Sequence, residues 1–456
     1  MTMLAITLPS ITIYQLFMFV GAFALILTLV LGYGHSKMKG EVARHPFSWF
    51  VQYFLGGLLL FSGFIKGVDP LGTAYKMQDY FTEFGSQGLP MMDTMHEYAL
   101  PFSVAMLVLE LTLGACLVLG IGGRKTTGIT LLLMLFFTFL TGFNYLTGYT
   151  DKSTGVLLHE FGKWGAFSDN NIRITDCGCF GDFMTLTPLA TFIKDILYTG
   201  LGIFLFISAY RLKEILPRSG TVRTLAVVGL MGGSLFFCLN NYYLELPMID
   251  FRPFKEGTDL NQAKADCDAN PGETRVHYVY QNKKTGKTVE VNDLELVKPA
   301  NKHLWTPDPV SGEKEWEALK EQTSYETIVE GCNSQIKYFD NYEVLEHKGY
   351  QFLVLAKNLD KSDKEAFKKI GANAAIAEKE GIPTRAMYNF IGKQSIDEFR
   401  QEVNGAYDFE TADDKLIKTI VRANPGLLLI KDGVVIKKWH HKHIPTYEEI
   451  KAEYMK

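Results

Sequence analysis

Two cysteines separated by one glycine, Cys177 and Cys179 in the stretch DCGCFGD, are the residues best suited to chemistry in this 456-residue chain. A disulfide between them closes a small ring, which a bent backbone at Gly178 permits. Such a ring is strained, and strain makes a disulfide easier to reduce, as suits an oxidising or catalytic bond. Structural bonds to other cysteines, idle thiols and a metal site are the alternatives, although the second Cys/His pair of a zinc site is missing, so no metal is predicted.

The other four cysteines favour structural interpretations. Cys267 and Cys332 lie in the charged C-terminal half, where we expect one structural disulfide between them. Unpaired thiols, or a redox relay through Cys332, are the alternatives. Cys116 and Cys238 lie inside apolar segments, where a small apolar filler is the better interpretation of each.

Four ionisable residues lie inside apolar segments, where a charge is expensive and therefore indicates function. Glu110 is in the middle of VLELTLG, so we expect it to be protonated, paired or facing a polar cavity. Its candidate roles are structural pairing inside the bundle, and proton handling or quinone binding. Lys66, Lys194 and Asp195 lie nearer the outer ends of their segments, close to the level of the two thiols. The lysines either supply a positive field that favours a thiolate or extend to the lipid headgroups.

Apolar runs of about 20 residues, long enough to cross a lipid bilayer, position these side chains. We predict six spanning helices, at 11–33, 47–67, 99–121, 127–149, 187–210 and 222–245. The first lacks a basic leader and a cleavage site, so we expect a retained helix rather than a signal peptide. The net charge of -4 gives no indication of nucleic-acid binding.

The basic residues of short loops predict the orientation. They fall in one alternating set of loops, which is therefore cytoplasmic: Lys37, Lys39, Arg44, Arg124, Lys125, Arg211, Lys213, Arg218 and Arg223. DCGCFGD and everything after residue 246 then face the opposite, periplasmic side of the inner membrane, where disulfides persist.

Two stretches carry a family resemblance. HPFSWFVQYFLGGLLLFSGFIKGVDPLGTAYKMQDYF resembles the opening of DoxX-type membrane proteins, an apolar helix followed by a re-entrant or interfacial one. DCGCFGD, followed by a helix with Lys194 and Asp195, resembles the related MauE type. The resemblance covers residues 47–210 and implies a four-helix bundle.

This resemblance implies electron flow from thiols to a quinone. MauE-type proteins are linked to disulfide formation in periplasmic enzymes, and DoxX-type subunits to quinone-linked sulfur oxidation. The bundle is also similar to that of vitamin K epoxide reductase. The chain departs from that group, because it has Cys-x-Cys in place of Cys-x-x-Cys and no cysteine in the external loop 68–98.

The sequence predicts two soluble parts in the C-terminal half. Residues 250–324 are a small β insert or linker, with a hairpin at Thr285-Gly286. Residues 325–456 start with an expected strand, IKYFDNYEVL, and continue with strands, helices and a hairpin at Asp432-Gly433. This order resembles a thioredoxin fold of the TlpA or peroxiredoxin type, whose cis-proline maps onto Pro425. AKNLDKSDKE, where the active cysteines should follow a strand, contains none, so the resemblance implies a binding or docking module.

The predicted architecture is a membrane α-helical bundle followed by a periplasmic α/β thioredoxin-like domain. Its parts are 1–46 (helix and cytoplasmic loop), 47–210 (bundle), 211–249 (loop and last helix), 250–324 and 325–456. It resembles envelope proteins of Bacteroidota.

Three functions compete. The first is an enzyme that passes electrons from periplasmic thiols through Cys177 and Cys179 to a quinone. The alternative is a non-enzymatic docking or assembly subunit of an envelope complex, whose soluble domain binds a protein partner. Transport, supported by Glu110 alone, is the third.

Overall fold

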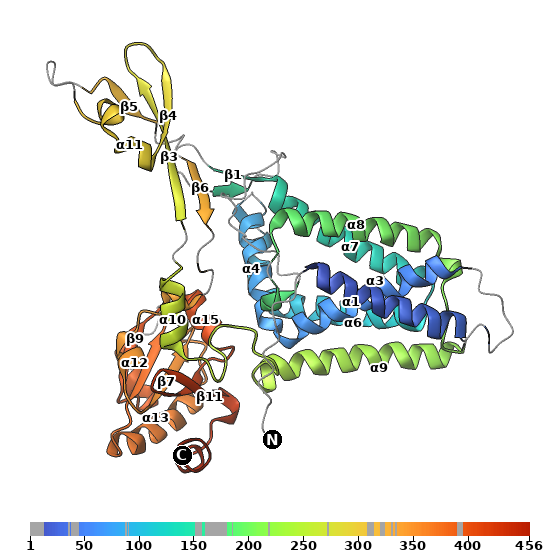
Figure 1. The fold of residues 1–456 in the computed structure, drawn as a ribbon. Coiled ribbons are helices and arrows are strands. Elements are labelled where there is room, and N and C mark those ends of the chain that lie inside the picture. The colour runs from blue at the N-terminus through green and yellow to red at the C-terminus, as the bar shows by residue number, and fades with distance from the viewer. Residues whose placement is uncertain are drawn as a thin grey trace.

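The computed structural model describes residues 13–34, 37, 45–86, 89, 91–150, 157–159, 180–184, 186–217, 219–270, 273–307, 314–319, 324–329, 332, 335–389 and 395–456. An apolar helical half lies beside two soluble parts, a small sheet and an α/β domain (Figure 1). Both soluble parts lie at the same end of the helices (Figure 1).

The helical half contains the spanning segments that the hydropathy predicts. Among the described residues, six helical segments are long and apolar enough to cross a membrane, which confirms a multi-pass helical domain. They are α1 (Ile13–Leu27) with its π-helical continuation η1 (Thr28–Gly34), α3 (Pro46–Val68), α6 (Ala99–Leu119), α7 (Arg124–Leu146), α8 (Pro188–Ile207), and α9 (Gly220–Leu239) with η5 (Asn240–Leu244).

Local sequence explains where the helices begin and end. Helix α8 starts at Pro188, whose fixed φ suits a first helical turn, and the Thr187 hydroxyl accepts a hydrogen bond from the Ala190 N–H. Helix α6 ends at Gly120, which adopts φ 69°. A Cβ there would also lie 2.0 Å from the Lys213 carbonyl oxygen, so only glycine fits this C-cap.

Close backbone contact joins the central helices. Helix α3 packs on α6, α7 on α8, and α9 on α6. Gly56 and Gly114 face each other across α3 and α6, and a Cβ on Gly114 would lie 2.8 Å from the Leu60 backbone nitrogen. Small residues at such a crossing let apolar helices approach closely without a hydrophobic driving force.

A short helix crosses one end of the bundle. Helix α4 (Pro70–Ser86) follows α3 directly and runs across the long helices, on the side where the soluble parts lie (Figure 1). It is followed by α5 (Met91–Glu97). Its position corresponds to the re-entrant or interfacial helix expected after Asp69-Pro70.

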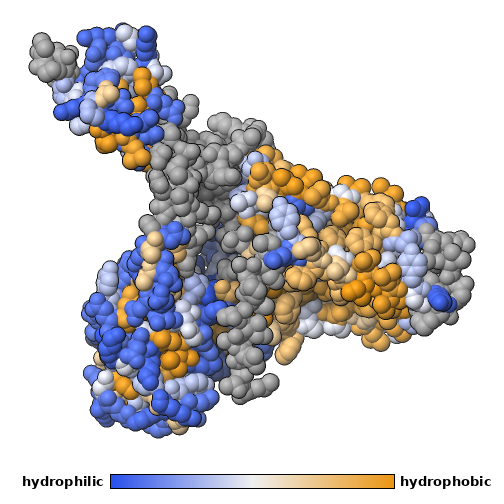
Figure 2. All heavy atoms as spheres, in the orientation of Figure 1, coloured by the Kyte–Doolittle hydropathy of each residue, from blue (hydrophilic) through white to orange (hydrophobic). Residues whose placement is uncertain are grey.

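The surface divides by polarity in the same way. Hydrophobic residues cover the helical half, and hydrophilic residues dominate the two soluble parts (Figure 2). Large apolar side chains of α9, such as Leu225, Val228 and Phe236, are exposed on the isolated chain, as lipid-facing side chains are.

The small sheet is antiparallel. Its strands are β3 (Glu273–Asn282), β4 (Thr288–Asn292), β5 (Trp316–Ala318) and β6 (Ser324–Val329), with β4, β5 and β6 all paired to β3. The predicted hairpin at Thr285-Gly286 joins β3 to β4, and Gly286 supplies the positive φ of the turn. The short α11 (Asp293–Leu296) follows β4.

A five-stranded mixed sheet organises the C-terminal domain, in the order β11-β10-β7-β8-β9. Strands β7 (Tyr350–Ala356), β8 (Thr384–Tyr388) and β9 (Asp408–Thr411) are parallel, and β10 (Gly426–Lys431) and β11 (Val434–His440) form an antiparallel hairpin. Buried side chains form one core with α13 (Lys364–Lys379), α14 (Ile396–Val403) and α16 (Tyr447–Tyr454), and another with α10 (Leu260–Asp268) and α15 (Asp414–Ile420). This is an α/β domain, and its thioredoxin-like character stays a prediction.

One predicted strand is wrong. The segment IKYFDNYEVL is helical, with a 3-10 turn at Gln335–Tyr338 and α12 at Tyr342–Glu346. The Asn341 side chain accepts a hydrogen bond from the Val344 N–H at 2.9 Å, which caps α12. Asparagine is among the preferred N-cap residues, so this side chain favours a helical turn here.

Candidate functional site

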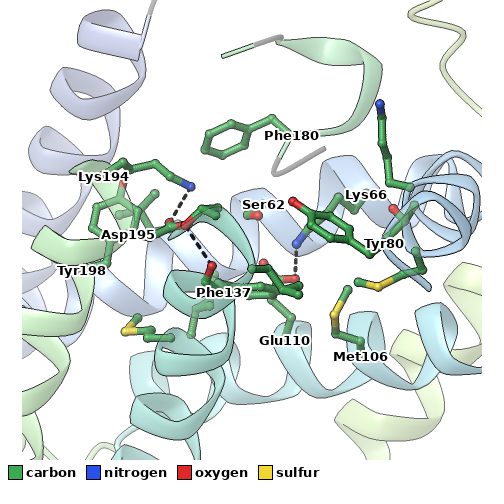
Figure 3. A pocket seen from close by; sticks show the side chains of 18 residues that line it. Ser62, Lys66, Tyr80, Met106, Glu110, Phe137, Phe180, Lys194, Asp195 and Tyr198 are labelled. Carbon is green, nitrogen blue, oxygen red and sulfur yellow. Dashed lines mark hydrogen bonds and ion pairs between the residues drawn. The ribbon is translucent and has the colours of Figure 1, made fainter. Parts of the chain in front are cut away.

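A pocket lies inside the helical half, between α3, α4, α6, α7 and α8. It contains about 820 Å³ of empty space, counting the part that opens to the outside. Its walls are mainly apolar and aromatic, with a few ionisable side chains (Figure 3). All four predicted supporting residues line it: Lys66, Glu110, Lys194 and Asp195. Sequence positions spread over 130 residues therefore meet at one site.

A buried ion pair forms one side of the pocket. The Lys66 Nζ atom of α3 lies 2.5 Å from the Glu110 Oε2 atom of α6, and the two side chains are 4% and 1% exposed. The same ammonium lies 5.0 Å from the centre of the Phe137 ring. Glu110 is thus paired, and it also lines a cavity. Lys66 points into the pocket, so the alternative in which it reaches the headgroups is wrong.

A second ion pair lies on the other side of the pocket (Figure 3). Lys194 and Asp195 are neighbours on α8, and Lys194 Nζ lies 2.9 Å from Asp195 Oδ1. Both side chains are buried, so Lys194 does not reach the headgroups either. The second carboxylate oxygen, Asp195 Oδ2, is buried without a hydrogen-bond partner among the described residues. An unsatisfied carboxylate oxygen in a cavity is a site for a donor from a ligand or a water molecule.

Phe180 joins the pocket to the two predicted redox cysteines. Its ring is 1% exposed, lines the pocket and lies 5.3 Å from the Lys194 ammonium. Cys177 and Cys179 themselves lie outside the described residues. Cys179 is nevertheless the residue bonded to Phe180 in the chain, so the dithiol segment leads directly into the wall of the pocket.

Helix α4 closes the pocket at the end of the bundle. Thr73, Met77 and Tyr80 line the cavity, and their spacing places them on one helix face. Asp69, at the junction between α3 and α4, accepts a hydrogen bond from the Gly72 N–H at 3.0 Å. Neither Tyr80 nor Asp69 was singled out from the sequence, although the spacing within α4 and the Asp-Pro break were available as signals.

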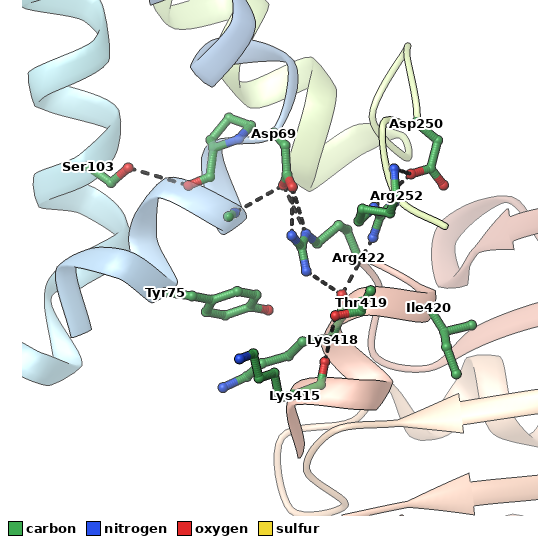
Figure 4. A network of polar contacts seen from close by, with 12 residues as sticks. Asp69, Tyr75, Ser103, Asp250, Arg252, Lys415, Lys418, Thr419, Ile420 and Arg422 are labelled. Atoms are coloured by element: carbon green, nitrogen blue, oxygen red, sulfur yellow. Dashed lines mark hydrogen bonds and ion pairs between the residues drawn. The ribbon is translucent and has the colours of Figure 1, made fainter. Parts of the chain in front are cut away.

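The α/β domain contacts this junction through Arg422 (Figure 4). The guanidinium lies 2.8 Å from Asp69 Oδ2, and the side chains are 6% and 12% exposed. Burial opposes ionisation of Asp69, but the positive charges of Arg422 and Arg252 and the hydrogen bonds to Arg422 and Gly72 hold the pKa of this carboxyl below its ordinary value. Asp69 is therefore a carboxylate at neutral pH.

The other cysteines and Pro425 lie away from the pocket, Cys267, Cys332 and Pro425 in the soluble half and the other two in α6 and α9. Cys267 on α10 forms a disulfide with Cys332, with 5.1 Å between their Cα atoms. The Asn424–Pro425 peptide bond is cis. Cys116 and Cys238 are free and buried. None of these side chains lines the pocket.

His440 ends β11, and His441 and His443 follow it in a 3-10 turn. Among the described residues, no group of three His, Cys, Asp or Glu side chains is placed to hold a metal ion. His440 is buried, and burial, together with the neighbouring positive groups, lowers its pKa to about 3. It is neutral at physiological pH.

Comparison with known proteins finds one similarity, which covers part of the helical half. Residues 44–155 match the family model described as methylamine utilisation protein MauE. This part of the membrane half is similar to MauE-type proteins. The matched residues include Lys66, Glu110 and α4, but end before DCGCFGD and α8. No curated protein and no solved structure gives a match to the chain.

Proposed function

We propose that this protein is a membrane-embedded thiol oxidoreductase that passes electrons from extracytoplasmic thiols through Cys177 and Cys179 to a quinone at the pocket. The observation that carries the proposal is the position of Phe180, which follows Cys179 in the chain and lines a pocket with two buried acid–base pairs. Similarity to MauE-type membrane proteins supports a role in redox maturation of other proteins.

The pocket residues fit a quinone. The apolar and aromatic walls suit its ring, and the lysine ammonium groups are donors for its carbonyl oxygens. The unpartnered Asp195 Oδ2 suits the hydroxyl of the reduced form. When bound, a quinone supplies a two-electron acceptor that also takes up two protons.

The thiol chemistry balances in two steps. A client thiolate attacks the Cys177–Cys179 disulfide and forms a mixed disulfide, releasing one cysteine as a thiolate. A second client thiolate then attacks the client sulfur of the mixed disulfide and displaces the other cysteine thiolate, leaving an oxidised client and a reduced dithiol. Re-forming the Cys177–Cys179 bond from the dithiol releases two electrons and two protons, which a quinone bound at the pocket would take up. Glu110 and Asp195 are the carboxylates at the pocket that can relay the protons, and the lysines favour the thiolate.

The proposed orientation places this reaction on the periplasmic side of the inner membrane. The basic loops predict that side for DCGCFGD, and α4 and both soluble parts lie at one end of the bundle together (Figure 1). The soluble domain would then lie where a protein client arrives.

The test is quinone reduction by purified protein supplied with a dithiol. We expect turnover by the wild type and its loss in Cys177→Ala and in Cys179→Ala. Cys238→Ala, which alters a buried free cysteine, is the matched control and should retain turnover. If the wild type shows no turnover with either benzoquinones or naphthoquinones, the proposed enzymatic function is rejected.

A specific observation favours the non-enzymatic alternative. The segment after β7, where a thioredoxin-like domain carries its active cysteines, has none, and Lys357 in this segment donates a hydrogen bond to the Tyr75 hydroxyl of α4 at 3.0 Å. The domain therefore uses this edge to contact the bundle. If turnover is absent while a protein partner binds the α/β domain, the chain is a docking subunit.

A further inference from the structure

Helix α4 has two functional faces. One face lines the pocket through Thr73, Met77 and Tyr80. Gly72 and Tyr75 of the same helix contact the α/β domain. The wall of the pocket is therefore also the surface on which the soluble domain lies.

The contact with the α/β domain is buried and specific. Arg422 Nε lies 3.0 and 2.8 Å from the two oxygens of Asp69, and Arg422 Nη2 lies 2.8 Å from Oδ2. A Cβ on Gly72 would lie 2.7 Å from Asp69 Oδ2 and 3.2 Å from Arg422 Nη2. Gly72 thus leaves the room that this forked ion pair needs at the start of α4.

A ring of cations surrounds Tyr75 (Figure 4). The ammonium of Lys418, the guanidinium of Arg422 and the ammonium of Lys357 lie 4.5, 5.2 and 5.4 Å from the ring centre. Lys357 also donates to the Tyr75 hydroxyl. The three cations come from two separate segments of the domain, the end of β7 and the region of α15, so Tyr75 is held only when the folded domain is in place.

We propose that Asp69, Tyr75 and Arg422 are positioning residues through which the α/β domain holds α4 against the bundle and thereby sets the shape of the pocket. Loss of this contact frees the start of α4 and exposes Thr73 and Met77. A client that binds the α/β domain and weakens this contact can therefore change access to the pocket without contacting the pocket itself. The meaning of this coupling for catalysis rests on the proposed function, but the coupling itself does not.

The direct test is the labelling rate of a cysteine placed at the pocket face of α4. Met77→Cys is introduced into the full-length chain with Cys177→Ser and Cys179→Ser, and labelled with a membrane-impermeant maleimide. Asp79→Cys, at an exposed position of α4, is the reference for full access. The chain that carries only Cys177→Ser and Cys179→Ser gives the background labelling rate of the remaining cysteines.

Two variants release the contact from opposite sides. Arg422→Gln changes the domain, and Tyr75→Ala changes α4. Arg385→Gln is the matched control, because its ion pair with Glu343 lies within the domain, 3.0 Å between Nε and Oε2. Retention of the α/β fold in each variant is checked by limited proteolysis.

We expect Arg422→Gln and Tyr75→Ala each to raise the labelling rate of the cysteine at 77 at least tenfold relative to the cysteine at 79, and Arg385→Gln to change it less than twofold. Changes below twofold in both release variants would overturn the proposal. In chains with the dithiol intact, the same two variants should raise KM for the quinone more than they lower kcat. If the wild type shows no turnover, the proposed function fails while the labelling result still decides the positioning role.

Discussion

The ion pair between Lys66 and Glu110 offers the sharpest quantitative prediction. The perturbation is a double-mutant cycle of Lys66→Met, Glu110→Gln and the two combined. We expect each single change to lower the free energy of unfolding by about 3–5 kcal/mol, because it leaves one buried group without its partner. The double change should recover most of that loss.

The magnitude follows from the geometry. At the 2.5 Å separation of Nζ and Oε2, the attraction is about 7 kcal/mol with an effective dielectric constant of ~20. Desolvation costs several kcal/mol for each ion, so the intact pair contributes little net stability. Removing one partner keeps the desolvation cost of the other and loses the attraction. The coupling free energy of the cycle should therefore reach about 3 kcal/mol or more.

Reversible unfolding of the reconstituted protein measures these values. Lys76→Met is the matched control, since Lys76 also lines the pocket but is 28% exposed and lies 3.9 Å from Asp79, an exposed pair worth about 1 kcal/mol or less. A loss below about 1 kcal/mol in Glu110→Gln, or a coupling free energy near zero, would refute the reasoning. Glu110→Gln should also impair quinone reduction more than Lys76→Met does.

Three further predictions concern the soluble half and its contact with the bundle. Cys267→Ser should lower the stability of the α/β domain by about 4 kcal/mol, as chain entropy predicts for a disulfide across a separation of 65 residues. Chemical unfolding of the full chain, compared with the oxidised wild type, measures the loss, and the reduced wild type should match the variant. The contribution of the Asp69–Arg422 contact to stability should be complete above the unfolded pKa of an aspartate, ~3.9, and be lost as the pH falls through the lower folded pKa of Asp69. Protection of the junction from a protease, measured as a function of pH, tests this. Protection that persists unchanged through acidification would contradict the assignment. Burial lowers the pKa of Lys438 to about 8 despite its contact with Asp250. Above that pH the unfolded state binds more protons than the folded state, so the free energy of unfolding should rise with pH from about 8 to the unfolded pKa of ~10.4. Unfolding measured as a function of pH should show this rise, and Lys438→Met should abolish it.

Local patterns in the sequence predicted most of the elements. The spanning helices follow from apolar runs whose length matches the bilayer, and these runs need no tertiary information. The hairpin turns at Gly286 and Gly433 follow from the need for positive φ. The segment around Asn341 shows the limit, because it is expected as a strand but forms a 3-10 turn and a short helix capped by Asn341.

The sequence by itself determined which residues are expensive to bury, and therefore that Glu110, Lys66, Lys194 and Asp195 need a reason to lie in apolar helices. Only the tertiary structure decided the reason. Helical periodicity orders residues within one helix, whereas Lys66 meets Glu110 across 44 residues and Asp69 meets Arg422 across 353, through packing of helices and domains. Such contacts depend on which faces pack together, and no local pattern records that choice.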